Sequence, residues 1–366
     1  GVVNAAMRPG YGADGLRARH HRDLTPLELL ELGPPDGVGA IEVCHDIERK
    51  LAWRPHTLAE LVDHMQELEE TAPASRAIRR LLDDATTSAG GERPKVTLLH
   101  DGRLWLAKLQ DRGDAPHLPA REYVVMHMAA ELGLQVPELR FEQHAGREVF
   151  LIERFDRCGD PLQPQRHLFA SAYTVLGLDA KSLPGDVRRS YLVLADQMRR
   201  WITDPEHCRH DLHELWRRMA YNALVGNRDD HPRNHGLLHD GSGWRLSKAF
   251  DITPLPTFAG VLAMSVAVDG SQECSLYKLL SACSHMGLDL RDAAAWLTRA
   301  SVHVAPHWES RLQLLGVSVT RIGQFAPAFV LATAWAQAPE QIEAAVQAIE
   351  QEQRKGRRRL LPPVQD

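Results

Sequence analysis

The sequence lacks any apolar run long enough to cross a bilayer, and no signal peptide opens it. We therefore expect a cytoplasmic protein with no membrane partner. Cysteine is scarce: the five cysteines among 366 residues are scattered and odd in number, which favours reduced thiols in a cytoplasm over a disulfide framework. Neither sign of charge dominates, since the formal net charge is −5, so the whole chain has no general attraction to nucleic acid.

Several familiar sequence patterns are missing as well. The chain has no internal repeat, no helix-turn-helix candidate, no Walker loop of the pattern G-x-x-x-x-G-K-[ST] and no G-x-G-x-x-G stretch. Its composition is ordinary for a globular protein, with 44% apolar and 25% charged residues. A chain of 366 residues is longer than one hydrophobic core usually supports, so two packed lobes are expected.

Hydrophobic periodicity predicts a helical beginning followed by a sheet. In "TPLELLELG", Thr25 and Glu28 form a capping box and Gly33 is a stop signal, so a short helix is expected. The period changes to two near Val96, where "VTLLH-DG-RLWLAKL" predicts a hairpin with Asp101-Gly102 as its turn. A helix in "REYVVMHMAAELG" and strands in "ELRFEQ" and "EVFLIERF" follow, which favours a mostly antiparallel sheet with one packed helix.

The rest of the chain is predicted to be mainly helical. Apolar stripes typical of helices occur in "SYLVLADQMRRWI" and "DLHELWRRMAYNALVG" and continue to about Ile349, with a second small hairpin in "HGLLHDGSGWRLS". We therefore predict the α+β class. The expected segments are a helical N-terminal segment, a sheet-bearing lobe, a helical lobe and a basic, flexible tail, at residues 1–80, 81–158, 159–350 and 351–366.

Polar side chains crowd one short stretch, "NRDDHPRNHG", at residues 227–236. Within it, Asp229 and Asn234 stand in the pattern D-x-x-x-x-N, and Asp251 follows across the second hairpin. This order recurs in phosphoryl transfer, where one carboxylate orients and deprotonates the attacking hydroxyl, and a carboxamide and a second carboxylate hold Mg²⁺ against nucleotide phosphates. Mg²⁺ prefers such hard oxygen ligands and needs only one or two protein carboxylates.

Phosphoryl transfer also needs a cation near the phosphates. Lys108 ends the strand "RLWLAK", and Glu122 in the next helix is placed to pair with it. The loop "SAGGERPK" contains Gly90 and Gly91, whose backbone amides can approach phosphate closely. Each feature alone is a weak signal, because short motifs recur by chance. Their order along the chain, from the glycine loop to Asp251, is what favours a kinase.

The stretch "NRDDHPRNHG…WRLSKAFDITP" resembles the catalytic core of the HipA-type toxin kinases. The segments "SAGGERPK", "AKL", "REY", "ERFDR" and "YTVLGLD…SYLVLADQ" also fall in that family's order, and the resemblance runs from about Leu24 to Ile349. It implies a bilobal protein-kinase-like fold, with a mostly antiparallel sheet plus helices in the N-lobe and a C-lobe that is nearly all α. It also implies an ATP- and Mg²⁺-dependent protein serine/threonine kinase that acts as the toxin of a bacterial toxin–antitoxin system, a class linked to persistence.

The resemblance also assigns roles to residues. Asp229 would be the catalytic base, and Asn234 and Asp251 the Mg²⁺ ligands. The residues expected at ATP are Lys108, held by Glu122, together with Gly90, Gly91, His231 and the hinge "IERF", which includes Glu153 and Phe155. The glycine loop of this family can be autophosphorylated, which makes Ser88 the first candidate for modification, followed by Thr87 and Thr86. A phosphate there would repel ATP.

The partners that the resemblance implies are a helix-turn-helix antitoxin of the HipB type, operator DNA through that antitoxin alone, and a protein substrate such as an aminoacyl-tRNA synthetase. Long family members carry a small β-rich subdomain before a segment that "MRPGYGADGL" resembles. We expect that subdomain to be missing, removed or encoded as a separate small protein. Two smaller departures, Lys248 in place of a frequent proline and Phe250 in place of tyrosine, are expected to be tolerated.

Other interpretations stay open at this point. A kinase of this fold can act on a small molecule or a lipid, and an inactive relative can serve as a DNA-binding co-repressor. The basic run from Arg354 to Arg359 is usually a solvated tail and alternatively contacts DNA phosphates. Asp230 is either a turn residue or a support for its loop, and we favour the support. A zinc site is disfavoured because no C-x-x-C occurs, and its candidate ligands would be His207, Cys208, His210 and His213.

Overall fold

The computed structural model describes residues 17, 20–62, 95–110, 116–144, 146–179 and 181–360. Its contacts form two compact units, each assembled from separate stretches of the chain. Unit 1 consists of Gly1–His127, Gln135–Lys181 and Pro232–Asp251. Unit 2 consists of Met128–Leu134, Ser182–His231 and Ile252–Asp366. The units are therefore interleaved along the chain, whereas the predicted segments are contiguous.

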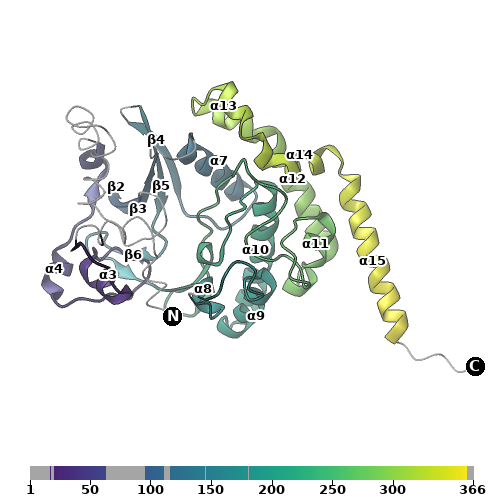
Figure 1. Cartoon of the computed structure of the whole chain (residues 1–366), viewed down its shortest axis with the longest axis horizontal. Helices are drawn as coiled ribbons and strands as arrows, with labels where there is room; N and C mark the ends of the chain where they lie inside the picture. Colours follow the sequence, from purple (N-terminus) through teal and green to yellow (C-terminus); the bar gives the residue numbers. More distant parts are fainter. Residues whose placement is uncertain are drawn as a thin grey trace, which may run out of the picture. The chain divides into compact units, whose positions relative to one another are not determined.

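Unit 1 is built on a five-stranded sheet with the strand order β1-β2-β3-β5-β4 (Figure 1). All neighbouring strands are antiparallel except the short β1, which runs parallel to β2. The strands are β1 (His56–Thr57), β2 (Lys95–His100), β3 (Arg103–Leu109), β4 (Leu139–His144) and β5 (Arg147–Glu153). The predicted α+β class and mostly antiparallel sheet are confirmed.

The β2–β3 hairpin forms where the sequence predicts it. Asp101 and Gly102 both have positive φ, at 48° and 70°, as a two-residue hairpin turn of the I′ type requires. The two-residue turn fixes the register of the hairpin, which pairs His100 with Arg103 next to the turn and Lys95 with Lys108 at the far end. This pairing matters for the site below.

The two faces of the sheet bury different partners. Val149 and Leu151 of β5 point to one face, where they join a cluster with Leu58 and Leu61. Phe150 points to the other face, where its ring centroid lies 5.9 Å from that of Tyr123 in helix α7 (Leu118–Glu131). The alternation of β5 side chains is therefore that of a strand buried on both sides.

The smaller strands of unit 1 form two further sheets. A three-stranded sheet has the order β10-β9-β8, and a two-stranded sheet joins β6 and β7. The β9–β10 pair is the predicted second hairpin. The elements of this region are β6 (Arg157–Cys158), β7 (Gln165–Arg166), β8 (Leu168–Ser171), α8 (Ala172–Val175), the 3-10 turn η1 (Pro232–Asn234), β9 (Gly236–His239) and β10 (Trp244–Leu246).

Within the described part of the N-terminal segment, irregular backbone separates two short helices. Helix α3 (Pro26–Leu32) has the expected capping box, in which Thr25 and Glu28 satisfy each other's backbone groups. A second helix, α4 (Ile47–Ala52), follows, but residues 33–46 between them form turns and irregular backbone. Proline and glycine in "GPPDGVG" explain this irregular backbone, because both residues disfavour a continuing helix.

The named elements of unit 2 are all helices among its described residues, and residues 252–275 form irregular backbone. Its long helices α9 and α10 match the two predicted apolar stripes, and Ser190 and Asp204 cap their first turns. The elements are α9 (Tyr191–Trp201), α10 (Pro205–Leu224), α11 (Leu276–Ser281), η2 (Ser284–Met286), α12 (Leu290–Leu314), α13 (Val319–Gly323), η3 (Ala326–Phe329), α14 (Val330–Gln337) and α15 (Glu340–Leu360).

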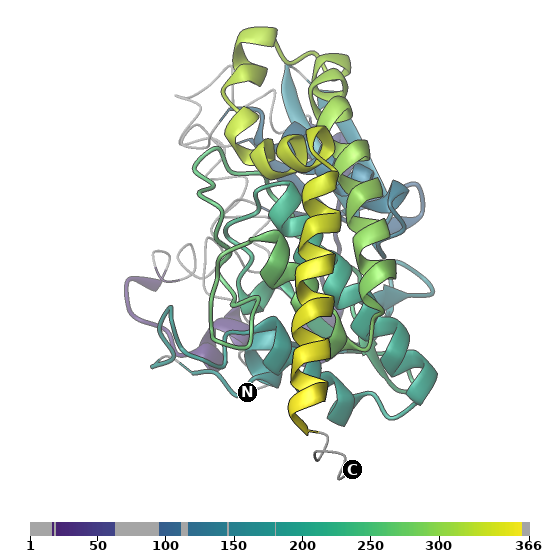
Figure 2. The ribbon, with the colours of Figure 1, turned by 90° about the vertical axis from the view of Figure 1, so that its right-hand side faces the viewer.

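The last helix continues further than the sequence predicts. We expected a flexible tail from residue 351, but α15 extends to Leu360. The residues after Ile349 are mainly good helix formers such as Glu, Gln, Arg and Lys, so one glycine is not enough to end the helix. Figure 2 shows α15 running alongside α11 and α12, and Arg291 of α12 bridges Glu343 and Glu350 of α15.

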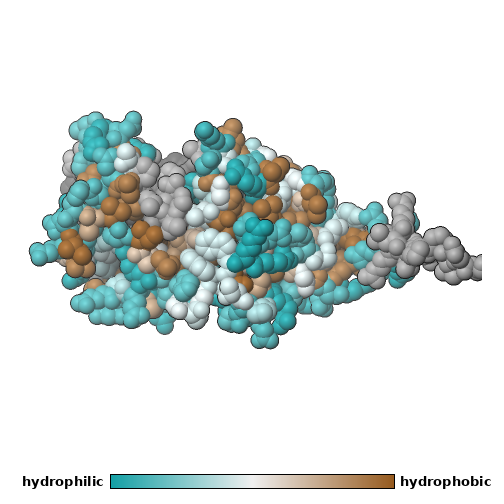
Figure 3. Space-filling model, turned by 90° about the horizontal axis from the view of Figure 1, so that it is seen from below, coloured by the Kyte–Doolittle hydropathy of each residue, from teal (hydrophilic) through white to brown (hydrophobic). Residues whose placement is uncertain are grey.

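Within the described residues, no helix combines the length and the hydrophobicity that a bilayer crossing needs. On the face drawn in Figure 3, hydrophobic residues occur in small groups that are broken up by hydrophilic ones.

Candidate functional site

Unit 1 contains a pocket with mostly apolar walls. Leu106 of β3 and Ile152 of β5 form part of the wall, and the rings of Phe155 and Phe250 stack with centroids 5.7 Å apart. Its volume is about 530 Å³ when space open to solvent is included. The lining residues are Val38, Lys95, Leu106, Lys108, Ile152, Glu153, Arg154, Phe155, Asp156, Phe250 and Asp251.

The polar end of this pocket is a cluster of buried charges. Lys108 of β3 donates to the carboxylates of both Glu122 and Asp251. Lys95, its cross-strand neighbour on β2, lies 3.6 Å from Asp251 between Nζ and Oδ2. Lys95, Lys108 and Glu122 are all less than 10% exposed. The predicted pair of Lys108 with Glu122 is therefore present in the structure, and Lys95 is an additional cation.

Burial and neighbouring charges act on these groups in opposite directions. Burial lowers the pKa of Lys108, but the charges of Asp251 and Glu122 outweigh it, and the net pKa lies above the usual value. Burial raises the pKa of Glu122, and the negative charge of Asp251 adds to this rise although Lys108 opposes it. One lysine is thus shared by two carboxylates, and neither of them has Lys108 to itself.

Asp251 has an uncommon backbone conformation. Its φ is 57°, in the left-handed region, which aspartate enters more readily than most residues other than glycine. The preceding Phe250 is fixed by stacking on Phe155. Residues held in this region cluster at functional sites, because the surrounding structure must compensate for the strain.

Asn234 lies in the 3-10 turn η1 and is buried. Three contacts hold its segment: the His235 carbonyl accepts the Ala172 amide at 2.8 Å, the Gly236 carbonyl accepts the Ser247 amide at 2.9 Å, and the Arg233 guanidinium lies 3.8 Å from the centre of the Tyr173 ring. The oxygens of Asn234 and Asp251 are the donor types that Mg²⁺ prefers.

A zinc site gains no support. Among the described residues, no group of three or more histidine, cysteine, aspartate or glutamate side chains is arranged to hold a metal ion. Cys208 is buried, and burial raises the pKa of its thiol. Deprotonation, which a metal ligand requires, is therefore disfavoured.

The hinge strand offers fewer free backbone donors than its sequence suggests. The amide of Glu153 donates to the Glu138 carbonyl at 3.0 Å, and the amide of Arg154 donates to the Leu104 carbonyl at 2.8 Å. The Glu153 side chain contacts Arg103 at 3.2 Å. A base bound in the pocket would therefore meet Phe155 rather than the amide of either preceding residue.

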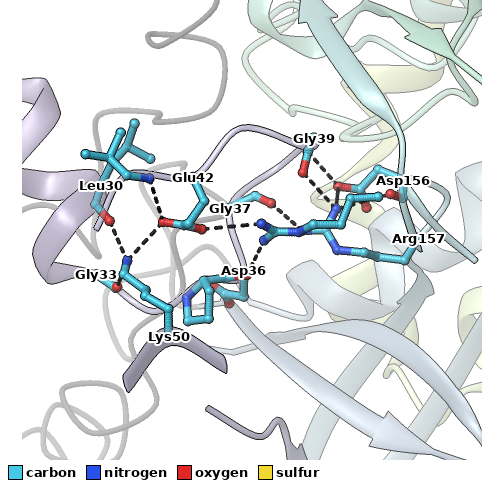
Figure 4. Close-up of polar contacts among 12 residues, drawn as sticks. Leu30, Gly33, Asp36, Gly37, Gly39, Glu42, Lys50, Asp156 and Arg157 are labelled. Carbon is cyan, nitrogen blue, oxygen red and sulfur yellow. Dashed lines mark hydrogen bonds and ion pairs between the residues drawn. The ribbon is translucent and has the colours of Figure 1, made fainter. Parts of the chain in front are cut away.

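A second buried charge cluster lies beside the hinge, and we call it the clamp: Arg154, Asp156 and Arg157 with the loop 36–39. Arg154 and Arg157 both donate to the Asp156 carboxylate, at 2.7–2.9 Å, and the Gly39 amide donates to it at 2.9 Å. Arg157 also donates to the carbonyls of Gly37 and Gly39 (Figure 4). Arg154 donates to the carbonyls of Asp36 and Gly37. The clamp fixes the loop that brings Val38 to the pocket.

Asp229 belongs to unit 2, where its loop is firmly anchored. Asn227 is buried, and its side chain donates to Asn222, which in turn donates to the Tyr191 hydroxyl, both at 3.1 Å. Asp230 is also buried, which favours its interpretation as a support for the loop. Asp229 itself is exposed in the turn, and its carbonyl accepts the amide of His231 at 2.8 Å. The exposed turn that carries Asp229 therefore has a buried, hydrogen-bonded support.

Gly226 explains how this loop begins. Its φ is 62°, and a Cβ added to it would lie 2.4 Å from the carbonyl oxygen of Ala328. A larger residue would have to displace backbone, so only glycine fits at the end of α10.

The structure brings together some of the predicted residues and leaves others untested. Lys108, Glu122, Asp251, Glu153 and Phe155 all belong to the pocket or to its charge cluster. His231 is partly buried in unit 2, next to the exposed Asp229 turn. The predicted glycine-loop residues lie outside the described residues; they are Gly90, Gly91, Ser88, Thr87 and Thr86.

The sequence analysis gave no role to Lys95 or to Val38, which both line the pocket. Lys95 could have been found, because a hairpin with a two-residue turn at Asp101-Gly102 must place it opposite Lys108. Val38 carries no such signal, since it reaches the pocket from an irregular loop that is held only by tertiary contacts.

Comparison with known proteins places these features in a family. The model of the HipA-like C-terminal domain matches residues 87–308. A Haemophilus influenzae protein is 29% identical over 153 residues, covering 38% of this chain and 43% of its own length. A Sinorhizobium fredii protein is 24% identical over 139 residues, covering 37% and 32%. The first is named "Putative kinase" and the second "Putative kinase Y4mE", and the match spans less than half of either relative.

A solved structure agrees with this match. The HipA protein of a Shewanella oneidensis toxin–antitoxin system, solved with HipB and operator DNA, superposes with a TM-score of 0.67 at 17% sequence identity. The superposition covers 95% of this chain and 86% of that one, which shows a shared fold. The resemblance proposed from "NRDDHPRNHG…WRLSKAFDITP" is confirmed by the family match. The chain belongs to the family defined by the HipA-like C-terminal domain.

Proposed function

We propose that this protein is an ATP- and Mg²⁺-dependent protein serine/threonine kinase. The observation that carries the proposal is Lys108, which is buried at the polar end of an apolar pocket and paired with Glu122 and Asp251. A lysine on a sheet strand, held by a helix glutamate beside a metal-binding aspartate, is the arrangement with which protein kinases bind ATP phosphates.

The pocket residues fit a nucleotide in two parts. The apolar walls, with Phe155 and Phe250, offer flat surfaces for a purine base. Lys108 and Lys95 at the other end offer two positive charges for phosphate oxygens. Asn234 and Asp251 would hold Mg²⁺, which when bound neutralises charge on the phosphates. A single carboxylate and an amide suffice, because Mg²⁺ takes its remaining ligands from water and phosphate.

Asp229 is the proposed catalytic base. Its exposed carboxylate can accept the proton of a serine or threonine hydroxyl on an incoming protein, and His231 beside it is a proposed nucleotide contact. The neighbouring Asn227 and Asp230 are buried and keep the loop in place. An exposed Asp229 on a buried support suits a catalytic base whose substrate hydroxyl arrives from solvent.

The biological setting is proposed from the family. The Shewanella protein is part of a toxin–antitoxin system and was solved with HipB and operator DNA. We infer that this chain is likewise a toxin restrained by a helix-turn-helix antitoxin, and that it reaches operator DNA through that partner. A translation component such as an aminoacyl-tRNA synthetase is the proposed substrate, and Ser88 the proposed site of autophosphorylation.

The test is ATP-dependent phosphate incorporation, measured by intact mass with phosphosite mapping, together with ADP release in the presence of candidate synthetases. Asp229→Asn should lower the rate by roughly 10²–10⁴, the usual contribution of a catalytic base. Asp196→Asn is the matched control, because Asp196 is an exposed aspartate of the same unit and makes only surface contacts with Arg199 and His285. Full activity of Asp229→Asn would refute the proposed role of this residue.

A further inference from the structure

The ring of Phe169 lies behind the pocket wall, in strand β8 of unit 1. It is 3% exposed, and its ring centroid is 6.4 Å from that of Phe155 and 6.5 Å from that of Phe250. Phe155 and Phe250 line the pocket, and Phe250 directly precedes Asp251. The ring therefore supports the wall that carries one of the proposed Mg²⁺ ligands.

The same ring also occupies the space beside Gly236. A Cβ built on Gly236 would lie 2.3 Å from Cζ of Phe169, closer than real carbon contacts allow. Gly236 does not have a positive φ, so its glycine is needed for space and not for backbone conformation. Asn234, the other proposed Mg²⁺ ligand, is two residues before it. Phe169 thus lies against Gly236, which follows Asn234 by two residues, and against the side chain of Phe250, which directly precedes Asp251.

A third contact ties Phe169 to the clamp loop. Gly39 has a φ of 89°, and a Cβ added there would lie 3.1 Å from Cβ of Phe169. Its amide donates to Asp156. Two glycines from distant parts of the sequence thus make room for one phenylalanine, which indicates that the position of this ring is closely specified.

We propose that Phe169 is a positioning residue that fixes the spacing between the segments bearing Asn234 and Asp251, and so sets the affinity of the site for Mg²⁺. This inference rests on the proposed function. The physical reason is that a metal ligand binds well only when its orientation is set by supporting contacts. Loss of a partner in direct contact with a ligand typically lowers metal affinity 10–100-fold, and Phe169 acts through the neighbours of the ligands, so the lower end of that range is expected. A merely structural ring would lower folding stability and leave the metal affinity of the folded protein unchanged.

The test is Mn²⁺ binding in the presence of a non-hydrolysable ATP analogue. Electron paramagnetic resonance measures the bound Mn²⁺, so no turnover is needed. Phe169→Leu should weaken Mn²⁺ binding about 10-fold. Gly236→Ala, which pushes against the same ring, should weaken Mn²⁺ binding similarly. Phe329→Leu is the burial-matched control, because Phe329 is 1% exposed in unit 2 and packs on Trp308.

The outcomes separate the two proposals. If Asp251→Asn weakens Mn²⁺ binding but folded Phe169→Leu and Gly236→Ala bind as the wild type does, the role of Phe169 is refuted and the proposed function stands. If the wild type binds no Mn²⁺ with the analogue, the proposed function fails and this inference fails with it. If the Phe329 control loses as much affinity as Phe169→Leu, the effect follows stability and the positioning role is refuted.

Discussion

Unit 1 contains two buried charge clusters that differ in what their cations contact. In the clamp, Asp156 receives hydrogen bonds from Arg154, Arg157 and the Gly39 amide. Burial alone would raise the pKa of Asp156, but the two arginines outweigh it and hold that pKa well below its usual range. In the pocket cluster, Lys108 is shared by two carboxylates, and the pKa of Glu122 is raised by burial.

The difference shows what each cluster is for. The clamp is complete without a ligand, because its donors also reach the carbonyls of the loop 36–39. The pocket cluster keeps two lysines and two carboxylates together at the end of a cavity, an arrangement that anionic phosphates and a divalent cation can reorganise. Both clusters combine buried cations with carboxylates, but the pocket cluster is the one whose cations stand at the end of a cavity that a ligand can enter.

The largest expected effect is on the clamp. Asp156→Asn leaves two buried guanidiniums without their counter-charge, which typically costs about 3–5 kcal/mol of folding free energy. Urea denaturation followed by tryptophan fluorescence measures the loss. Asp160→Asn, at an exposed aspartate nearby, is the control. A loss below about 1 kcal/mol for Asp156→Asn would contradict the view that the clamp is a structural element.

Next in size is the effect of Lys95→Met on ligand binding. If Lys95 meets a phosphate, the loss of one charge-assisted hydrogen bond should weaken ATP binding by roughly 10–100-fold and leave adenosine binding unchanged. Calorimetric titration of both ligands provides the comparison. Lys248→Met is the control, because Lys248 is an exposed lysine two positions before Phe250. Equal losses for ATP and adenosine would show that Lys95 supports the fold and not the phosphates.

A smaller stability effect is expected at Glu122. Glu122→Gln removes a buried charge whose pKa is already raised, while Asp251 still neutralises Lys108, so the folding free energy should change by less than about 1 kcal/mol. Phosphate transfer should nevertheless fall, since Lys108 loses the partner that holds it. Measured together, stability and rate separate the two roles. A loss of stability as large as that of Asp156→Asn would erase the distinction between the clusters.

The smallest effect is a difference in pH dependence. A raised folded-state pKa contributes stability that is lost as pH rises through it, so the wild type should gain stability over Glu122→Gln as pH falls from 7 towards the ordinary glutamate pKa of 4.5. The neighbouring Lys108 stays charged throughout this window, because its pKa is raised. The Asp156 contribution, from a lowered pKa, is lost only below about pH 4. The difference in folding stability between the wild type and Asp156→Asn should therefore stay constant from pH 7 to 5. Thermal denaturation across this pH range measures it.

Local signals predicted the parts of the fold that depend on neighbours in the sequence. The hairpin at Asp101-Gly102, the capping box at Thr25 and the apolar stripes of α9 and α10 each depend on a few adjacent residues, and each is present. The two-residue strand β1 is too short for any period to appear, and its parallel pairing with β2 depends on distant packing.

The candidate site was predictable to the extent that its chemistry is carried by motifs. Lys108, Glu122 and Asp251 come from separate elements, and their order along the chain indicated a shared role before their contacts were known. The clamp and Phe169 were not predictable, because no local pattern places Gly39 and Gly236 against one ring or Asp156 against the loop 36–39. Such contacts depend on the packing of distant segments, which periodicity does not reveal.

The central claim is that the pocket cluster is built for nucleotide phosphates, and calorimetric titration of Lys108→Met tests it most directly. The titrations use ATP with Mg²⁺, and adenosine alone, on the wild type and the variant. The account predicts that the wild type binds both ligands, and that Lys108→Met loses at least about 10-fold in ATP affinity while its adenosine affinity is unchanged. Equal ATP affinity for the folded variant and the wild type would contradict the account.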